Sequence, residues 1–184
     1  MVGREEQRAK AVERLSAHAL ATGLSQTSLR QLASAAGVSD RMLLYYFSDK
    51  NDVLVTVLGS LSADLAQRLA LAFPETQILP VSELAVRLTR ELLSDNHRPY
   101  IRLGVEIMSA AARKEQPFML LSEGIRATFI QWIVTRMDAP EGSDREAVAA
   151  ILLGLIDGLV LIGACVEDDL VERAIETIPT LVGR

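Results

Sequence analysis

A short stretch, residues 27–54, constrains the fold more than any other part of this chain. Ser28 is a good N-cap, and Gln31 three residues later completes a capping box, so a helix begins there. Gly37 ends this helix where a left-handed backbone is needed. Ser39 can cap a second short helix. Two helices joined by about three residues that include a glycine have the spacing of a DNA-binding helix-turn-helix.

The same stretch resembles a known family in residue type and spacing. Its first run is Leu-Ala-x-x-Ala-Gly-Val-Ser at residues 32–39, and its second is Leu-x-Tyr-Tyr-Phe-x-x-Lys at residues 43–50. Without a gap, both runs look like the N-terminal domain of the TetR family of transcriptional regulators. The chain departs from the usual family pattern at Asp40, Met42 and Leu44. Because these positions lie on the helix that would read bases, they bear on the operator sequence and not on the fold.

The outward positions of the second helix are the candidate base contacts. If this helix enters the major groove, Arg41 can bond O6 and N7 of a guanine with two parallel hydrogen bonds. Met42 and Leu44 offer apolar contact to a thymine methyl group. The hydroxyls of Tyr45 and Tyr46 can bond phosphates. A partly structural role for Tyr45, which would fill space between helices, stays open.

Further phosphate contacts are implied by the family resemblance, at Thr27, Arg30 and Lys50. The net charge of −5 at first weighs against a nucleic-acid binder. The charge is unevenly distributed, however: residues 1–60 carry 7 basic and 6 acidic side chains, and residues 61–184 carry 12 and 18. Local phosphate contacts dominate affinity for DNA, so this distribution is compatible with binding and predicts modest non-specific affinity.

The remaining pattern predicts an all-α fold with two domains. Residues 1–50 form a three-helix DNA-binding domain with the helix-turn-helix, and residues 51–184 form a helical ligand-binding and dimerisation domain. No alternating strand pattern occurs. Apolar periodicity and the intervening breakers predict the other helices. Their expected ranges are 4–22, about 49–73, 81–95, 99–114, 117–138, 144–166 and 168–182.

The resemblance implies a small-molecule pocket in the C-terminal body, without saying which side chains line it. Apolar residues at helical spacing and two glutamates are the candidates: Leu61, Leu65, Leu103, Glu106, Met108, Met119, Glu123, Phe129 and Trp132. A stripe of Met and aromatic residues is more often ordinary core, with the glutamates solvated. Both interpretations stay open from the sequence.

The last two helices carry a candidate dimer surface. Small residues on one face allow a second helix to approach closely, and an apolar stripe on the final helix matches it. The expected interface residues are Ala147, Ile151, Gly154, Gly158, Leu170, Ala174 and Ile178. Because a single copy would leave this apolar surface exposed, we expect a homodimer with a four-helix bundle about a two-fold axis.

Neither catalysis nor a bound metal or cofactor finds support in the sequence. His18 and His97 have no carboxylate at metal-ligand spacing, and neither a phosphate-cradling glycine loop nor a nucleophile elbow occurs. The single cysteine, Cys165, fits a reducing cytoplasm. Residues 147–166 are apolar, but Asp157 at their centre and the acidic flanks favour a buried helix over a membrane span.

These observations together predict a cytoplasmic, homodimeric transcriptional regulator that binds double-stranded DNA. The resemblance favours a repressor on an inverted-repeat operator that a small-molecule effector releases. A protein-interaction module that has this fold but has lost DNA binding is the first alternative. An enzyme with a helical pocket is the second, and the missing acid, base and nucleophile argue against it.

Overall fold

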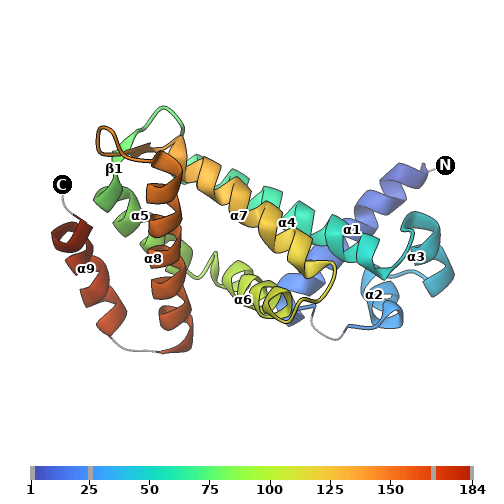
Figure 1. Cartoon of the computed structure of the whole chain (residues 1–184). Coiled ribbons are helices and arrows are strands. Elements are labelled where there is room, and N and C mark those ends of the chain that lie inside the picture. The colour runs from blue at the N-terminus through green and yellow to red at the C-terminus, as the bar shows by residue number, and fades with distance from the viewer. Residues whose placement is uncertain (1–2, 25–26, 167–168, 183–184) are drawn as a thin grey trace. The chain divides into compact units, whose positions relative to one another are not determined.

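A computed structural model describes residues 3–24, 27–166 and 169–182 of the chain. Helices make up nearly all of its regular structure, which confirms the all-α fold class (Figure 1). The elements in chain order are α1 (Arg4–Thr22), α2 (Leu29–Ala36), α3 (Asp40–Tyr46), α4 (Lys50–Ala72), β1 (Leu79–Pro80), α5 (Val81–Leu93), α6 (Arg98–Ala112), α7 (Phe118–Val134), β2 (Met137–Asp138), α8 (Arg145–Cys165) and α9 (Leu170–Val182). The expected start of the last helix at residue 168 lies outside the described residues.

The chain divides into two compact units. The first unit combines Met1–Ala66 with Arg102–Glu123, and the second combines Gln67–Ile101 with Gly124–Arg184. Helices α4, α6 and α7 each contribute residues to both units. A single cut along the sequence therefore does not separate the two units.

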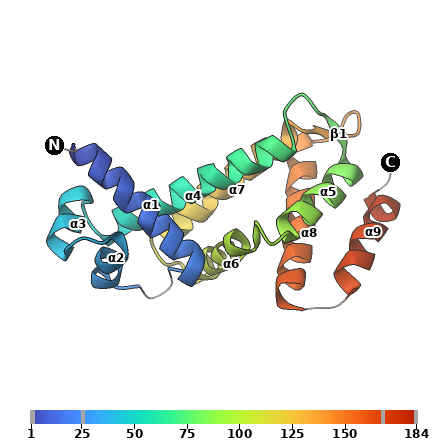
Figure 2. The same ribbon diagram turned by 180° about the vertical axis from the view of Figure 1, so that it is seen from behind.

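The first unit contains the helix-turn-helix, and its local signals act as the sequence predicts. The Ser28 hydroxyl accepts a hydrogen bond from the Gln31 N–H, and the Gln31 side chain accepts one from the Ser28 N–H, which completes the capping box. Gly37 ends α2 with a left-handed backbone at φ 71°. The Ser39 hydroxyl then caps α3 by accepting from the Met42 N–H at 3.2 Å. Figure 2 shows α1, α2 and α3 grouped at the N-terminal end of this unit.

Apolar side chains fix these three helices to one another. Leu15 of α1, Leu32 of α2 and Leu43 of α3 are fully buried, as is Phe47 directly after α3. Burying side chains of this size stabilises a fold by about 1.5–3 kcal/mol each. The core therefore determines which face of α3 points inward and which remains at the surface.

The second unit packs α5 against α8 and α9, which lie side by side in both ribbon views (Figures 1 and 2). Its core includes Leu84 and Leu88 of α5, Leu152 and Ile156 of α8, and Ile175 of α9, all of them buried. By length and hydropathy alone, α4 and α8 could each cross a membrane. Such helices also occur in the cores of folded soluble proteins, and one face of α8 is buried in this core.

A short pair of parallel strands was not predicted. Leu79 of β1 pairs with Met137 of β2, and the Leu79 N–H donates to the Arg136 carbonyl at 2.9 Å. The range 117–138 predicted for one helix is accordingly too long, because α7 ends at Val134 and the chain then turns into β2. Two-residue strands are too short to show the alternation by which strands are identified in a sequence.

Candidate nucleic-acid interface

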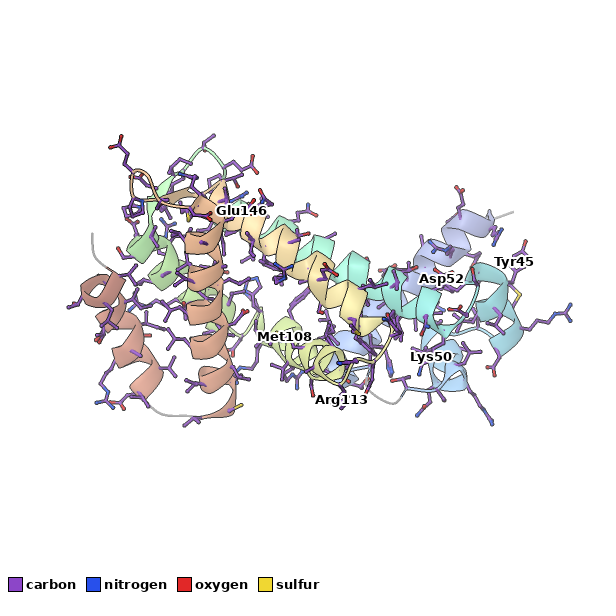
Figure 3. The ribbon with its side chains drawn as sticks, viewed as in Figure 1. Tyr45, Lys50, Asp52, Met108, Arg113 and Glu146 are labelled. Carbon is purple, nitrogen blue, oxygen red and sulfur yellow. The ribbon has the colours of Figure 1, made fainter. Side chains whose placement is uncertain are left out.

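Helix α3 has a buried face and an exposed face. Leu43 and Phe47 lie in the core, as predicted. Met42, Leu44 and Tyr45 are 40%, 46% and 56% exposed. Tyr45 lies at the outer side of α3, at the edge of the first unit (Figure 3). The side chains predicted to touch bases therefore lie at the surface, where DNA can reach them.

Tyr46 is an exception, and its predicted outward position is wrong. Its side chain is only 8% exposed, because the residue falls on the same face as Leu43. Its ring meets the Tyr45 ring edge to face, with 5.7 Å between the ring centroids. Tyr46 therefore supports the position of Tyr45 from the interior. Thr27, which the family resemblance implied as a phosphate contact, is likewise buried, and its N–H donates to the Leu24 carbonyl at 3.3 Å.

The predicted cationic contacts remain at the surface. Arg30 and Arg41 are exposed, and Lys50 is half-buried at the start of α4 (Figure 3). Within the described part of the chain, none of these three side chains forms an ion pair with a carboxylate. Their charges are therefore available to phosphate or base groups.

Arginines of α1 hold the helix-turn-helix in place, and the sequence reasoning missed them. Arg14 Nη1 donates to the Ala36 carbonyl at 3.0 Å, at the end of α2. Arg8 Nε donates to the Tyr46 carbonyl at 3.3 Å, and its guanidinium lies 4.8 Å from the Phe47 ring centroid. Cations at helix C-termini complement the helix dipole and satisfy its terminal carbonyls.

A third arginine reaches the exposed end of α3. Arg4 Nη2 donates to the Tyr45 carbonyl at 2.9 Å, and its guanidinium lies 4.8 Å from the centroid of the Tyr45 ring. The spacing of Arg4 and Arg8, one helical turn apart on one face, was the available signal for this pair of contacts. Their acceptors, which are backbone carbonyls far along the chain, could not be identified from that spacing.

The start of α4 is fixed by hydrogen bonds around Asp52. Its carboxylate accepts from the Ser48 N–H at 2.8 Å and from the Thr56 hydroxyl at 3.3 Å. The hydrogen bond from Ser48 holds the pKa of Asp52 below its usual value. Arg8 Nη2 also donates to the Thr56 hydroxyl at 3.2 Å. These bonds connect α1 to the helix start that carries Lys50.

An open hollow is lined by the end of α1 and by α2. Its volume is about 680 Å³, and its lining includes His18 and Thr22 of α1, Gly23, Thr27, and Gln31 of α2. None of the residues predicted to bind ligand lines it. The hollow is open and its lining is about as polar as apolar, so it differs from the apolar, enclosed cavities that drug-sized ligands occupy.

The candidate ligand-binding residues do not form one group in the structure. Phe129 and Trp132 belong to the second unit and the others to the first. Leu61 and Leu103 are buried core residues, and Leu65 is half-buried. Met108 and Met119 are 49% and 39% exposed, and Met108 is visible on α6 in Figure 3. Glu123 is exposed, as the alternative interpretation expected.

Glu106 has a different role from the one predicted. Both of its carboxylate oxygens accept hydrogen bonds from the Leu24 N–H, at 3.2 and 3.1 Å. Glu106 is therefore an internal contact from α6 to the end of α1, and not an acidic anchor for a ligand. Leu24 lies beyond the end of α1, and the Glu106 carboxylate satisfies its buried backbone N–H.

Trp132 is placed among aromatic and cationic neighbours in the second unit. Its ring lies 5.8 Å from the Phe73 ring and beneath the Arg136 guanidinium, which is 4.2 Å from the ring centroid. The Trp132 Nε1–H is buried and has no hydrogen-bond acceptor among the described residues. A buried donor without an acceptor is uncommon in a folded protein and needs an explanation.

Most of the expected dimer residues are exposed in the single chain. Ile151 and Leu170 are 75% and 52% exposed, Ala147 and Gly154 are exposed, and Gly158 and Ala174 are half-buried. Ile178 was predicted wrongly: it is 1% exposed and belongs to the core of the second unit. An apolar stripe on a short helix does not reveal whether its own chain or a second copy covers it, and Ile178 is covered by its own chain.

No three His, Cys, Asp or Glu side chains in the described residues are close enough to hold a metal ion. Comparison with known proteins identifies the helix-turn-helix instead. Residues 17–57 match the family model described as bacterial regulatory proteins, tetR family. No curated protein sequence matches the chain.

Solved structures share the fold along nearly the whole chain. A Rhodococcus sp. protein assigned to the TetR-family transcriptional regulators has 16% identity and a TM-score of 0.75, and the match covers 96% of this chain and 98% of that one. The multidrug binding protein EbrR, complexed with malachite green, has 20% identity, a TM-score of 0.66 and coverages of 97% and 99%. The transcriptional regulator FadR from Bacillus subtilis, in complex with stearoyl-CoA, has 16% identity, a TM-score of 0.62 and coverages of 92% and 96%.

Identities this low show the fold alone, and the match to the family model is confined to the helix-turn-helix region. The match over residues 17–57 covers the end of α1, all of α2 and α3, and the start of α4. These are the elements whose caps, buried face and exposed face are described above. Residues 17–57 therefore match the DNA-binding domain of the TetR family of bacterial regulatory proteins, and the chain as a whole shares the fold of solved TetR-family regulators.

Proposed function

We propose that this chain is a ligand-responsive repressor that binds an inverted-repeat operator as a homodimer. The observation that carries the proposal is the exposed face of α3. Arg41, Met42, Leu44 and Tyr45 lie at the surface, and the opposite face of the same helix is fixed in the core. A short helix held in this way can present its side chains to the major groove without bending or unfolding.

The proposed contacts divide into base and phosphate contacts. Arg41, in the first turn of α3, would bond a guanine edge, and Met42 and Leu44 would touch thymine methyl groups. Arg30, Tyr45 and Lys50 would bond phosphates and set the position of the protein on the duplex. In this division of roles, residues 1–50 read the DNA and residues 51–184 bind the effector and dimerise.

The homodimer would use the exposed stripe of α8 and α9. Ala147, Ile151, Gly154 and Gly158 share one face of α8, and Leu170 adds apolar surface at the start of α9. A Cβ added at Gly154 or Gly158 meets no atom of the same chain within 4 Å, so a second helix has room to approach. A two-fold pair would place two α3 helices in successive major grooves, with half-sites about 34–36 Å apart or a multiple of that distance.

The effector proposal is supported by the unpartnered Trp132 donor. An effector with an oxygen acceptor would satisfy the buried Nε1–H, and Phe129 on the same helix would add apolar contact. This effector site lies in the second unit, and the candidates Leu61, Leu65, Leu103, Met108 and Met119 of the first unit are not part of it. The effector needs only a stronger affinity for the conformation that does not bind DNA. A preference of about 10⁴-fold would give a nearly complete switch.

Selection of bound duplexes from a random DNA pool by the purified protein tests the function. We expect enrichment of an inverted repeat whose half-sites are separated by about one helical turn or a multiple. Arg41→Ala should then relax specificity at one base position in each half-site, and Lys50→Ala should weaken all sequences alike. Arg126→Ala removes an exposed arginine of α7 outside the helix-turn-helix and is the matched control.

The alternative results have distinct meanings. A folded protein that enriches no duplex at low salt would contradict the DNA-binding proposal and favour the protein-interaction module. Enrichment of a single, unrepeated site would contradict the dimeric arrangement. For the effector, the chain has one tryptophan, so its fluorescence reports on Trp132 directly. Stearoyl-CoA is a suitable first probe, because a protein of the same fold binds it.

A further inference from the structure

Arg4 lies beside the exposed end of α3 and is fixed there by two contacts. Its Nη2 donates to the Tyr45 carbonyl at 2.9 Å, and its guanidinium lies 4.8 Å from the Tyr45 ring centroid. An exposed arginine usually samples many rotamers, and holding it in one position lowers the entropy that binding must overcome. The two contacts of Arg4 therefore hold its positive charge at a defined position on the surface before any ligand binds.

Tyr45, which holds Arg4, lies on the face that would meet DNA. It follows Arg41 by four residues, so the two side chains are neighbours on one side of α3. The Tyr45 ring is supported on another side by the buried Tyr46, whose ring it meets edge to face. Arg41, Tyr45 and Arg4 thus form a continuous exposed strip of two cations with an aromatic ring between them.

The three arginines of α1 use their guanidinium groups differently. Arg8 donates part-buried hydrogen bonds to the Tyr46 carbonyl and the Thr56 hydroxyl. Arg14 donates a part-buried hydrogen bond to the Ala36 carbonyl. Arg4 is exposed, and among the described residues it makes one hydrogen bond and no ion pair. A guanidinium has five N–H donors in a fork that matches the oxygens of a phosphate, so most donors of Arg4 remain available.

From this geometry we propose that Arg4 is a further DNA contact outside the helix-turn-helix. Its guanidinium binds a backbone phosphate beside the half-site that α3 reads, and Tyr45 holds it in position. This inference depends on the proposed DNA-binding function and deepens it. Arg4 supplies affinity and position on the duplex, and it carries no base specificity of its own.

The salt dependence of affinity tests this contact, because each phosphate contact releases counterions. The dissociation constant for the selected duplex is measured between 50 and 200 mM salt for the wild type and Arg4→Ala. Because the proposed dimer carries two copies of Arg4, the variant loses one phosphate contact in each half-site, and the slope of log K against log salt should fall by about 1.8. Across this fourfold range the wild type should lose about 12-fold more affinity than the variant.

Lys10→Ala provides the matched control. Lys10 is an exposed cation of the same helix, but its ammonium is paired with Glu6 at 3.0 Å. Its removal changes the net charge equally and should leave the slope unchanged. Arg4→Gln keeps a donor for the Tyr45 carbonyl and removes the charge, so it should lower the slope as Arg4→Ala does. Circular dichroism and the melting temperature show whether each variant is folded.

Tyr45 variants separate the positioning role from general damage. Tyr45→Phe keeps the ring, so Arg4→Ala should still lower the slope in that background. Tyr45→Ala removes the ring that holds the guanidinium, so adding Arg4→Ala to it should change the affinity much less than in the wild type. Additive effects of Tyr45→Ala and Arg4→Ala would overturn the positioning by Tyr45.

The outcomes distinguish this inference from the proposed function. If the wild type selects a duplex and Lys50→Ala lowers the slope while Arg4→Ala does not, the Arg4 contact is overturned and DNA binding stands. If the folded wild type selects no duplex, both are overturned. If Arg4→Ala and Lys10→Ala lower the slope equally, the effect belongs to net charge, and the specific phosphate contact is overturned.

Discussion

The Glu106 carboxylate accepts two hydrogen bonds from the N–H of Leu24, although the residues are 82 positions apart. Leu24 follows Gly23, where α1 ends. Arg102, one turn before Glu106 on α6, donates to the Leu20 carbonyl at 3.4 Å. Helix α6 therefore supplies both an acceptor and a donor to the end of α1, which adjoins the helix-turn-helix within the first unit.

Removal of the Glu106 carboxylate should destabilise the first unit. Glu106→Ala leaves the Leu24 N–H without its acceptor in a part-buried place, so the free energy of unfolding should fall by about 1–2 kcal/mol. Urea denaturation followed by circular dichroism measures this change. Glu123→Ala removes an exposed glutamate of α7 and should change stability by less than about 0.5 kcal/mol. Equal effects of the two substitutions would contradict a specific role for Glu106.

Gly23 should not tolerate a side chain. Its φ of 82° is strained for any other residue, and an added Cβ would lie 2.6 Å from Glu106 Oε2. Gly23→Ala should therefore lower the free energy of unfolding by about 1–3 kcal/mol. Gly59 lies inside α4 with no atom within 4 Å of an added Cβ, and Gly59→Ala should stabilise by about 0.5–1 kcal/mol. Opposite signs in thermal melts are the expected result, and a Gly23→Ala protein as stable as the wild type would contradict strain at this position.

Arg136 is a buried cation that connects segments of the second unit. It is 3% exposed, its Nε donates to the Phe73 carbonyl at 2.7 Å, and its Nη1 donates to the Trp132 carbonyl at 3.1 Å. Burial lowers the pKa of Arg136, and the nearby Glu75 opposes that effect. The guanidinium therefore satisfies carbonyls at the ends of α4 and α7 at once.

Neither Lys nor Met should replace Arg136. Arg136→Met leaves the Phe73 carbonyl without its donor, whereas the Trp132 carbonyl keeps the Thr135 hydroxyl at 2.9 Å, so the free energy of unfolding should fall by about 1–3 kcal/mol. Arg136→Lys keeps the charge but cannot reproduce the planar fork, so it should recover less than half of this loss. Arg126→Met, at an exposed position of α7, is the control for thermal melts. Full recovery by Lys would show that charge alone matters.

Local chemistry made the helix-turn-helix predictable from sequence. The caps at Ser28 and Ser39 and the turn at Gly37 are each determined within a few residues, and all three occur as predicted. The face of α3 was less predictable. In a seven-residue helix, Tyr45 and Tyr46 are adjacent, and only the packing of the three helices decides which one turns inward.

Contacts between distant residues were not predictable. Arg4 and Arg8 bond carbonyls 41 and 38 residues away, and Glu106 bonds an N–H 82 residues away. Nearly every residue has the same backbone N–H and carbonyl groups. The sequence therefore cannot show which of these groups a distant side chain will bond. The small residues of α8 recur at helical spacing, so their common face could be predicted. Ile178 shows that an apolar stripe alone does not indicate whether its own chain or a second copy covers it.

Asp157 should make stability depend on pH. Desolvation raises the pKa of its carboxyl above the ordinary value of 3.8, although the side chain remains exposed in the single chain. The folded state therefore binds more protons than the unfolded state between 3.8 and the raised pKa. The free energy of unfolding should therefore fall as the pH rises from 3.8 to the raised pKa. Above the raised pKa, the ionised carboxylate should keep the folded state destabilised by a constant amount.

The substitution Asp157→Asn removes this ionisation. The melting temperature at pH 7 should rise, and the variant should lack the part of the acid-side pH dependence that belongs to Asp157. The pH dependence of thermal melts in matched buffers measures the difference between the two proteins. Asp169→Asn changes an exposed carboxylate at the start of α9 and serves as the control. A lower melting temperature for Asp157→Asn at pH 7 would show that the ionised carboxylate is stabilising.

Gly158→Leu separates the proposed dimer from the stability of the single chain. An added Cβ at Gly158 meets no atom of the same chain within 4 Å, so the folded monomer should accept the larger side chain. A second α8 approaching this face would meet the leucine, and dimerisation should weaken at least tenfold, which corresponds to about 1.4 kcal/mol. Gly124→Leu, at an equally open position of α7, should leave dimerisation unchanged. Light scattering across a concentration series measures both. An unaltered dimer in Gly158→Leu, with its helical circular dichroism retained, would move the interface away from this face of α8.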